Sequence, residues 1–171
     1  MHTSKKISFG IGALKRLRPF VSTDTAIKIY NSLIRPHFDH CSPVWDSMCG
    51  LLNDKLQKLQ NRAARVILKC GYDTSSSVLL DRLGWDNISL SFKKQKAVMM
   101  HKVVNDLTPA YLNEMFTNTD TGYTLRNNEN KLQLPKPRTD YLKRSFCYDG
   151  AAVWNKLPEN IRTTSSLRVF R

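Results

Sequence analysis

The chain has 171 residues and carries 27 lysines and arginines against 14 acidic residues, a formal net charge of +13 at pH 7. This length fits one domain, or one domain with an appendage, and suffices for a sizeable core. The charge favours a negatively charged partner, either nucleic acid or an acidic surface. The sequence has no run of 18 apolar residues and no signal-peptide segment, so we expect no membrane contact and an intracellular protein, nuclear or cytoplasmic and not secreted.

The four cysteines form no CxxC pair, and three of them lie in apolar or helical context, as small core residues do. This usage favours a reducing compartment. The cysteines are Cys41, Cys49, Cys70 and Cys147.

The first predicted helix covers residues 7–20, although Gly10 and Gly12 each weaken it by about 1 kcal/mol. No acidic residue occurs before Phe20, so this segment is strongly basic. Its apolar residues recur at helical spacing. They are Ile7, Ile11, Leu14 and Leu17.

A second helix follows, and either Ser22 or Thr23 fits its N-cap. Pro36 is expected to end or bend this helix, because proline lacks the N–H that a helix interior requires. Residues 37–47 predict a short, broken helix with Pro43 inside it.

The helix predicted for residues 52–69, with Gly71 as its C-cap, carries two stripes. Apolar residues recur at steps of three and four: Leu56, Leu59, Ala63, Val66 and Cys70. The residue before each of them is cationic: Lys55, Lys58, Arg62, Arg65 and Lys69. Like charges at these spacings cost about 0.2–0.5 kcal/mol per pair, so the cationic stripe calls for an anionic partner.

Two more helices are predicted beyond this point, at 75–83 with Gly84 behind it and at 88–105. The longer one has an apolar face and a basic outer face. The apolar residues are Leu90, Ala97, Met100, Val103 and Val104, and the outer residues are Lys93, Lys94, Lys96 and Lys102.

The remaining segments are shorter. Pro109 begins a short helix that extends to about Phe116. The polar stretch 117–140 predicts a loop with one short strand near 131–134. Residues 141–146 predict an extended segment, and 150–155 a short helix.

The sequence offers little support for catalysis or for a metal site. It has no Gly-rich phosphate loop, no HExxH and no convincing carboxylate pair; Asp39 and Asp46 suit solvated helix ends. Two histidines and two cysteines loosely suggest zinc, but their spacing matches no standard ligand set, and ordinary packing is the alternative. These four residues are His37, His40, Cys41 and Cys49.

The cationic stripe is the sharpest functional signal. A solvated helix face usually mixes both signs, whereas this stripe has only Asp54, at its start. Five cations facing backbone phosphates predict a salt slope of about −4.5, and neighbouring Gln57, Gln60 and Asn61 offer further hydrogen bonds. The three tryptophans favour core anchoring over base stacking. They are Trp45, Trp85 and Trp154.

The order of several segments resembles the region after the palm in non-LTR (LINE-type, jockey-like) retrotransposon reverse transcriptases. The first three segments are IGALKRLR, IYNSLIRPHFDHCSPVW and KLQNRAARVIL. The tail is similar in style, with Arg138 followed by SF, WNKLPENIR and SSLRVF. The resemblance covers nearly the whole chain and rests on order and spacing, since no single segment is diagnostic.

The resemblance implies a mainly α fold: a thumb-like helical bundle (1–72), a helical connector (73–116), a polar loop (117–140) and a small irregular α/β C-terminal unit (141–171). In that family the thumb holds the template–primer duplex, an RNA–DNA hybrid or duplex, against the palm. We expect backbone contacts from eight cations. They are Lys15, Arg16, Arg18, Lys55, Lys58, Arg62, Arg65 and Lys69.

The family's catalytic strand, an aromatic residue followed by x-Asp-Asp, is absent from this chain. The chain is therefore expected to be a fragment without enzymatic activity, without a small-molecule ligand and without a cofactor, the divalent metal belonging to the missing palm. The missing palm and fingers are its expected partners. The alternatives are a standalone basic nucleic-acid-binding protein and a protein-interaction module.

Overall fold

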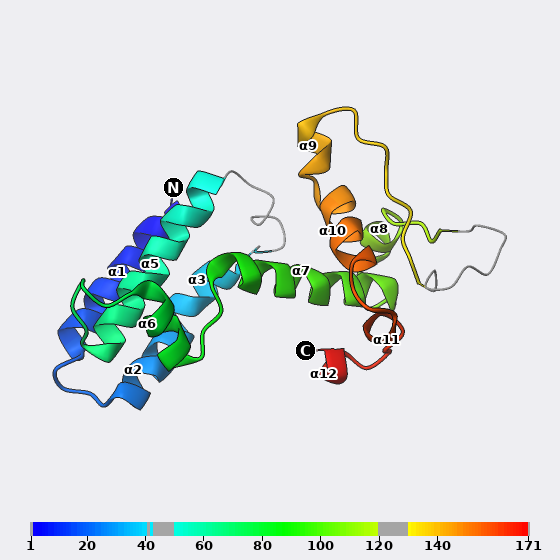
Figure 1. Ribbon diagram of the computed structural model, residues 1–171. Helices are drawn as coiled ribbons and strands as arrows, with labels where there is room; N and C mark the ends of the chain where they lie inside the picture. The colour runs from blue at the N-terminus through cyan, green and yellow to red at the C-terminus, as the bar shows by residue number, and fades with distance from the viewer. Residues whose placement is uncertain (1, 41, 43–49, 120–129, 171) are drawn as a thin grey trace. The chain divides into compact units, whose positions relative to one another are not determined.

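The computed structural model describes residues 2–40, 42, 50–119 and 130–170, which are mainly α-helical (Figure 1). The predicted mainly α class is therefore confirmed. Among the described residues the structure has no strand, so the strand expected at 131–134 and the expected α/β character of the C-terminal unit are not found; one isolated β-bridge joins Asn118 to Leu132. The helices are α1 (His2–Leu17), α2 (Thr23–Ile29), η1 (Tyr30–Ile34, a π-helix), α3 (Arg35–Asp39), α5 (Gly50–Leu68), α6 (Ser76–Leu83), α7 (Ile88–Val104), α8 (Ala110–Asn113), α9 (Asp140–Lys143), α10 (Phe146–Asn155), α11 (Glu159–Arg162) and α12 (Leu167–Phe170).

The described residues form two compact units. The first comprises the described residues up to 42 and those from 50 to 91, and the second those from 92 onward. The first turn of α7 belongs to the first unit and its remainder to the second. α6, expected in the connector, also belongs to the first unit.

The first unit is built on the packing of α1 against α5. Ile7, Ile11 and Leu14 of α1 are fully buried, as the helical spacing predicts, but Leu17 of the same predicted face is exposed. Gly10 permits close approach to η1, because a Cβ atom there would lie 2.9 Å from Cγ1 of Ile34. The glycine that weakens α1 as an isolated helix therefore has a packing function.

The second helical run begins as predicted, since the Ser22 side chain accepts a hydrogen bond from the Thr25 N–H. It does not end at Pro36. The run passes through the π-helix η1, in which the Arg35 N–H reaches the carbonyl of Tyr30. Pro36 then lies in the first turn of α3, where its missing N–H has little cost.

The buried face of α5 differs from the predicted one. Leu59, Val66 and Cys70 are only half buried. The buried face of α5 is shifted around the helix from the predicted one and includes Gln60. This glutamine can be buried because its side-chain amide donates a hydrogen bond to the Asp86 carbonyl. The buried residues are Leu56, Gln60, Ala63, Ala64 and Ile67.

α5 ends at Leu68, one residue before its predicted end, and Gly71 is not its C-cap. Lys69 adopts the left-handed conformation, with φ of 54°. The Cys70 N–H returns to the Arg65 carbonyl, and the Lys69 N–H to the Val66 carbonyl. This pair of bonds is a Schellman motif with lysine at the position usually taken by glycine.

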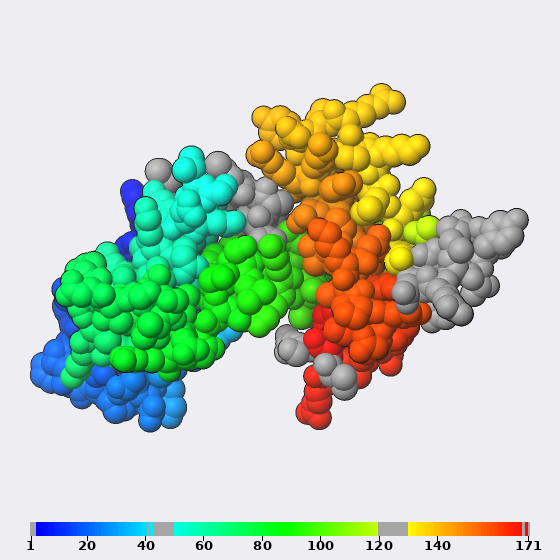
Figure 2. All heavy atoms as spheres, in the orientation of Figure 1, coloured from blue at the N-terminus to red at the C-terminus, as the bar shows by residue number. Residues whose placement is uncertain are grey.

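α6 packs against α5, and both helices contribute to the surface of the first unit in Figure 2. It ends at Gly84, which has φ of 63°, as predicted. The side chain of Asn87 then accepts a hydrogen bond from the Leu90 N–H at the start of α7. These two signals set the turn between α6 and α7.

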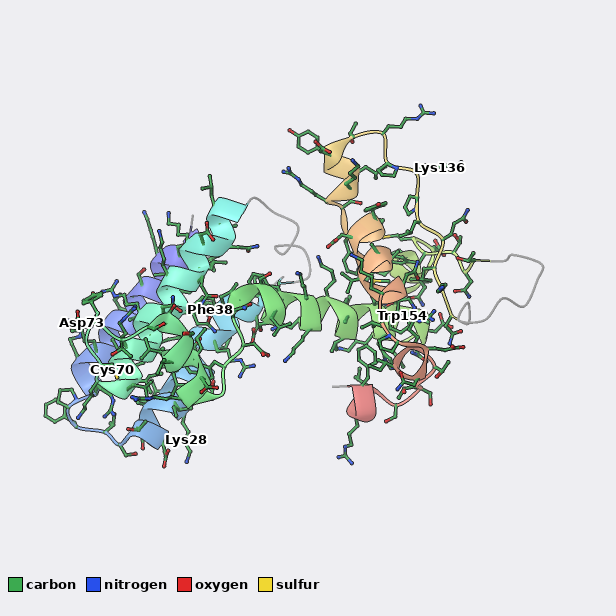
Figure 3. All side chains as sticks on the ribbon, in the orientation of Figure 1. Lys28, Phe38, Cys70, Asp73, Lys136 and Trp154 are labelled. Carbon is green, nitrogen blue, oxygen red and sulfur yellow. The ribbon has the colours of Figure 1, made fainter. Side chains whose placement is uncertain are left out.

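The second unit has a core centred on Trp154, which is fully buried (Figure 3). Its indole N–H donates to the Asn130 carbonyl at 2.7 Å. Met100, Leu132 and Ala151 complete the buried cluster. The predicted core role is thus confirmed for Trp154; Trp45 lies outside the described residues.

Two predictions in the second unit are wrong. Lys96 is not on the outer face of α7: it is fully buried and forms an ion pair with Asp149 of α10. Residues 141–146 are not extended, because α9 and then α10 begin there. The side chains of Thr139 and Ser145 accept hydrogen bonds from backbone N–H groups and cap these two helices.

Candidate nucleic-acid interface

A groove of about 510 Å³ lies where the end of α1 meets the end of α5. We call it the basic groove, because five of its nine lining residues are cationic and none is acidic. It brings together cations that the sequence places about 50 residues apart. The lining residues are Lys15, Arg18, Pro19, Arg62, Arg65, Val66, Lys69, Cys70 and Tyr72.

The stripe predicted on α5 reaches beyond the groove along the same helix. We call Lys55, Lys58, Arg62, Arg65 and Lys69 the cationic face; all are exposed except Arg65, which is half buried. Lys55 and Lys58 continue the face toward the start of α5. Lys15 of α1 extends it sideways across the groove, and Arg16 is exposed but does not line it.

Arg18 differs from the other predicted contact residues because it is only 8% exposed. Its guanidinium donates to the carbonyls of Ile67 and Val21 and to the Thr23 hydroxyl, each at 2.8 Å. The Ile67 carbonyl is in the last turn of α5, where no intrahelical partner remains. Arg18 therefore acts structurally, as a cap of α5 that closes the end of the groove.

Arg65 and Tyr72 form a pair inside the groove. The Arg65 Cζ lies 5.4 Å from the centroid of the Tyr72 ring, a cation–π contact. Nη2 of Arg65 also donates to the Thr74 carbonyl at 3.4 Å. Tyr72 itself is 85% exposed; Figure 3 labels Cys70 and Asp73, on either side of it in the chain.

The residues of the cationic face form no ion pairs within the part of the chain that the structure describes. The ion pairs found within the described ranges involve Arg35, Lys96 and Lys143, and none includes a residue of the cationic face. The helix dipole favours Arg65, which lies in the last turn of α5. It does not account for Lys55 and Lys58, because the effect falls off within one turn of the helix end.

The polar neighbours of the cationic face are engaged inside the protein. The Gln57 amide donates to the side-chain oxygens of Gln60 and Asn61, both at 2.8 Å. The Gln57 side-chain oxygen accepts from the Ile88 N–H. These residues join α5 to the start of α7, so we remove them from the expected backbone contacts.

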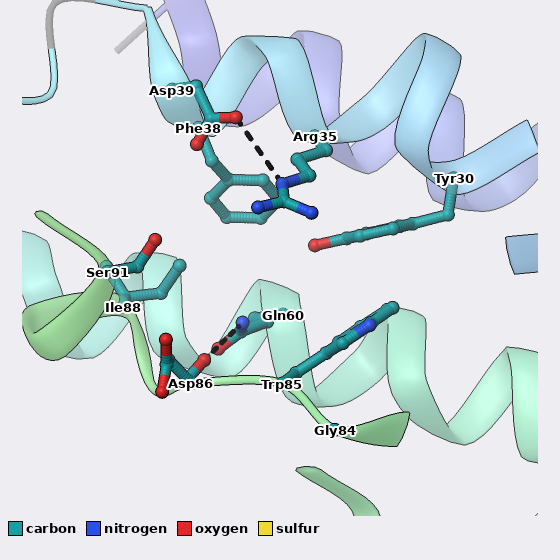
Figure 4. Close-up of a pocket in the computed structure, with 10 residues that line it drawn as sticks. All are labelled: Tyr30, Arg35, Phe38, Asp39, Gln60, Gly84, Trp85, Asp86, Ile88 and Ser91. Carbon is teal, nitrogen blue, oxygen red and sulfur yellow. Dashed lines mark hydrogen bonds and ion pairs between the residues drawn. The ribbon is translucent and has the colours of Figure 1, made fainter. Parts of the chain in front are cut away.

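A second, smaller pocket of about 100 Å³ lies elsewhere in the first unit (Figure 4). The rings of Tyr30 and Trp85 stack there, with 4.3 Å between centroids and 21° between planes. Burial raises the pKa of the Tyr30 hydroxyl well above its ordinary value of 10.0, with a smaller opposing effect from Arg35. Arg35 pairs with Asp39 beside the ring, so this pocket contains both signs of charge.

The four residues that loosely suggested zinc in the sequence are His37 and His40, which are described, and Cys41 and Cys49, which lie outside the described residues. Within the described ranges, no group of three or more His, Cys, Asp or Glu side chains is arranged to hold a metal ion. Nor does any described helix combine the length and apolar character needed to cross a membrane.

Comparison of the chain with models of protein families, with curated proteins and with solved structures gives no match. The basic groove and the resemblance noted in the sequence are therefore the features that point to a function.

Tyr72 was not among the residues predicted from the sequence. Its position in the sequence could have indicated an exposed aromatic ring. Tyr72 follows directly after a cationic helix and stands between Gly71 and Asp73, neither of which offers an apolar side chain to cover the ring. The turn that carries it, however, depends on Lys69 being left-handed, and lysine seldom adopts that conformation.

Proposed function

We propose that this chain binds the sugar–phosphate backbone of nucleic acid through the cationic face and the basic groove. The supporting observation is that α1 and α5 bring cationic side chains together in a single groove that has no acidic lining residue. Four residues of the cationic face recur at steps of three and four along α5, and Lys69 follows directly after the end of the helix. Lys and Arg side chains arranged in this way neutralise successive phosphates and release counterions.

From the resemblance we propose a more specific role. The first unit would be the thumb-like bundle of a non-LTR retrotransposon reverse transcriptase, and the rest its connector and C-terminal unit. The bound nucleic acid would be the template–primer, an RNA–DNA hybrid or duplex. Polymerisation and its divalent metal would belong to the palm, to which this chain would dock, and the chain itself would be non-enzymatic.

Lysine footprinting of the wild-type chain tests the binding site directly. We expect bound duplex to protect Lys15, Lys55, Lys58 and Lys69 from acetylation, as measured by mass spectrometry. Lys28, Lys136 and Lys156 are also exposed but lie outside the face, and they serve as internal controls; Figure 3 labels Lys28 and Lys136. Equal protection of both groups would show non-specific charge attraction and overturn the assignment.

The proposed parent enzyme is tested by reading the transcript upstream of Met1. An in-frame aromatic-x-Asp-Asp strand, some tens of residues before it, would support the polymerase reading. Untranslated sequence in that place would leave a standalone basic protein, and only the binding part of the proposal would stand.

A second candidate function, as a protein-interaction module, is favoured by one observation. An almost wholly apolar groove of about 420 Å³ runs along α1 beside η1. Phe9, Leu17 and Leu33 line it and remain exposed, and Lys5 and Lys6 also line it. An apolar groove with lysines among its lining residues suits an acidic amphipathic helix, whose apolar face would fill the groove and whose carboxylates would meet the lysines.

A synthetic acidic amphipathic peptide with leucines at helical spacing is the probe for this candidate. Phe9→Asp with Leu33→Asp should abolish its binding and leave nucleic-acid affinity unchanged. Phe20→Asp alters another exposed phenylalanine that does not line this groove and should have no effect. Absence of peptide binding to the wild-type chain would eliminate the candidate.

A further inference from the structure

Tyr72 has an environment that neither core packing nor backbone binding explains. Its ring is 85% exposed, whereas Trp154 is fully buried and Trp85, which is half buried, stacks on Tyr30. It nevertheless lines the basic groove together with Lys15, Arg62 and Lys69. An aromatic side chain held at the surface among phosphate-binding cations has the composition of a single-strand binding site.

The backbone after α5 holds this ring in place. Lys69 in the left-handed conformation reverses the chain, and the Cys70 N–H bonds to the Arg65 carbonyl at 3.1 Å. The chain therefore returns over the last turn of α5, where the Arg65 guanidinium lies against the Tyr72 ring. Arg65 also bonds to the Thr74 carbonyl, two residues beyond the ring, so it fixes both the ring and the turn that carries it.

We propose that Tyr72 is a stacking platform for an unpaired base, so that the basic groove takes a single-stranded segment of nucleic acid. The proposal rests on the proposed backbone binding and deepens it. Arg65 is a positioning residue, because it holds the ring, while Lys15, Arg62 and Lys69 face the phosphates on either side of the stacked nucleotide. The groove volume, about 510 Å³, is within the range of sites that hold small molecules.

Duplex alone does not satisfy this subsite. Paired bases already stack on one another, and only an unpaired base presents a free face to an aromatic ring. The chain should therefore prefer a duplex with a single-stranded overhang, or a single strand, over a blunt duplex of the same phosphate number. Stacking is not sequence-specific, so no base preference is expected.

The test compares Tyr72→Ala with Tyr72→Phe, using fluorescence anisotropy on a 20-nucleotide single strand and on a blunt duplex. Tyr72→Ala should lose about 5- to 140-fold in affinity for the single strand. Tyr72→Phe keeps the ring and should bind as the wild type does. Blunt-duplex affinity should change less than twofold in both variants, and Tyr141→Ala, at a tyrosine that is 88% exposed outside the groove, should alter neither.

Three results would overturn the proposal. Equal losses on both probes in Tyr72→Ala would show that the ring supports the groove without stacking. A loss in Tyr72→Phe as large as in Tyr72→Ala would assign the effect to the hydroxyl and not to the ring. Unchanged single-strand affinity in Tyr72→Ala would exclude the platform. If charge reversal on the cationic face still weakened binding, the proposed backbone binding would survive this failure, so the two failures are distinguishable.

Discussion

The Arg18 guanidinium donates a hydrogen bond from Nε to the Ile67 carbonyl oxygen at 2.8 Å and joins the end of α1 to the last turn of α5. The two residues are 49 positions apart. This bond holds the two walls of the basic groove together. A cation that the sequence assigns to the nucleic acid is thus used to build the site that would bind it.

Replacing Arg18 should chiefly lower the stability of the fold, because its hydrogen bonds are made within the protein. Arg18→Met leaves the Ile67 and Val21 carbonyls and the Thr23 hydroxyl without this donor, so we expect a loss of about 2–3 kcal/mol in unfolding free energy. Arg16→Met changes an exposed side chain and should stay within about 0.5 kcal/mol of the wild type. Urea denaturation measures both; equal stability of the two variants would refute the capping role.

Lys69 permits binding and stability to be separated. Lys69→Gly should raise the unfolding free energy by about 1 kcal/mol, because glycine adopts positive φ without strain. It should also weaken nucleic-acid binding about fivefold at 0.15 M salt, the loss of one phosphate contact. Lys28→Ala is the control for the charge. A Lys69→Gly variant that is more stable and binds as tightly as the wild type would remove Lys69 from the interface.

Gly10 and Gly12 form a matched pair on α1. Alanine improves helix propensity by about 1 kcal/mol at either site. At Gly10, however, the new Cβ would lie 2.9 Å from the buried Ile34 side chain, while at Gly12 nothing is within 4 Å. Gly10→Ala should therefore be about 1–3 kcal/mol less stable than Gly12→Ala. Thermal or urea unfolding of the two variants gives this difference, and equal stabilities would contradict the packing of α1 on η1.

The burial of Tyr30 should make the folded protein less stable above pH 10. Its folded-state pKa is raised above the unfolded value of 10.0 by burial, so its neutral form is favoured in the fold. The contribution is fully present below pH 10 and falls by up to about 1.4 kcal/mol per pH unit above it. Tyr30→Phe keeps the stack on Trp85 and should remove this fall; the difference between the two pH profiles is the measurement. Parallel profiles above pH 10 would contradict the account.

Local signals were sufficient to place most helices. The spacing of Ile7, Ile11 and Leu14 predicted α1, and the apolar spacing at 52–69 predicted α5 to within two residues of its observed bounds. Ser22 and Gly84 were identified as helix boundaries because capping depends on residues close in sequence. These predictions required no knowledge of what each helix packs against.

Burial of polar side chains was the part that the sequence did not reveal. Arg18 and Lys96 were both predicted at the surface, yet each is buried against a partner 49 or 53 residues away, Ile67 or Asp149. Gln60 is buried for a similar reason, since its acceptor is Asp86. Such pairings depend on tertiary contacts, which helical periodicity does not encode.

The most direct test of the central claim is the salt dependence of duplex binding in two variants of equal charge. One carries Lys15→Glu, Lys58→Glu and Arg62→Glu, and the other carries Lys28→Glu, Lys136→Glu and Lys156→Glu, all at exposed positions. The account predicts that the first variant's slope of log K against log salt is reduced by about 2.7, three phosphate contacts, while the second keeps the wild-type slope. Equal changes of slope in the two variants would show that net charge, and not the cationic face, governs binding.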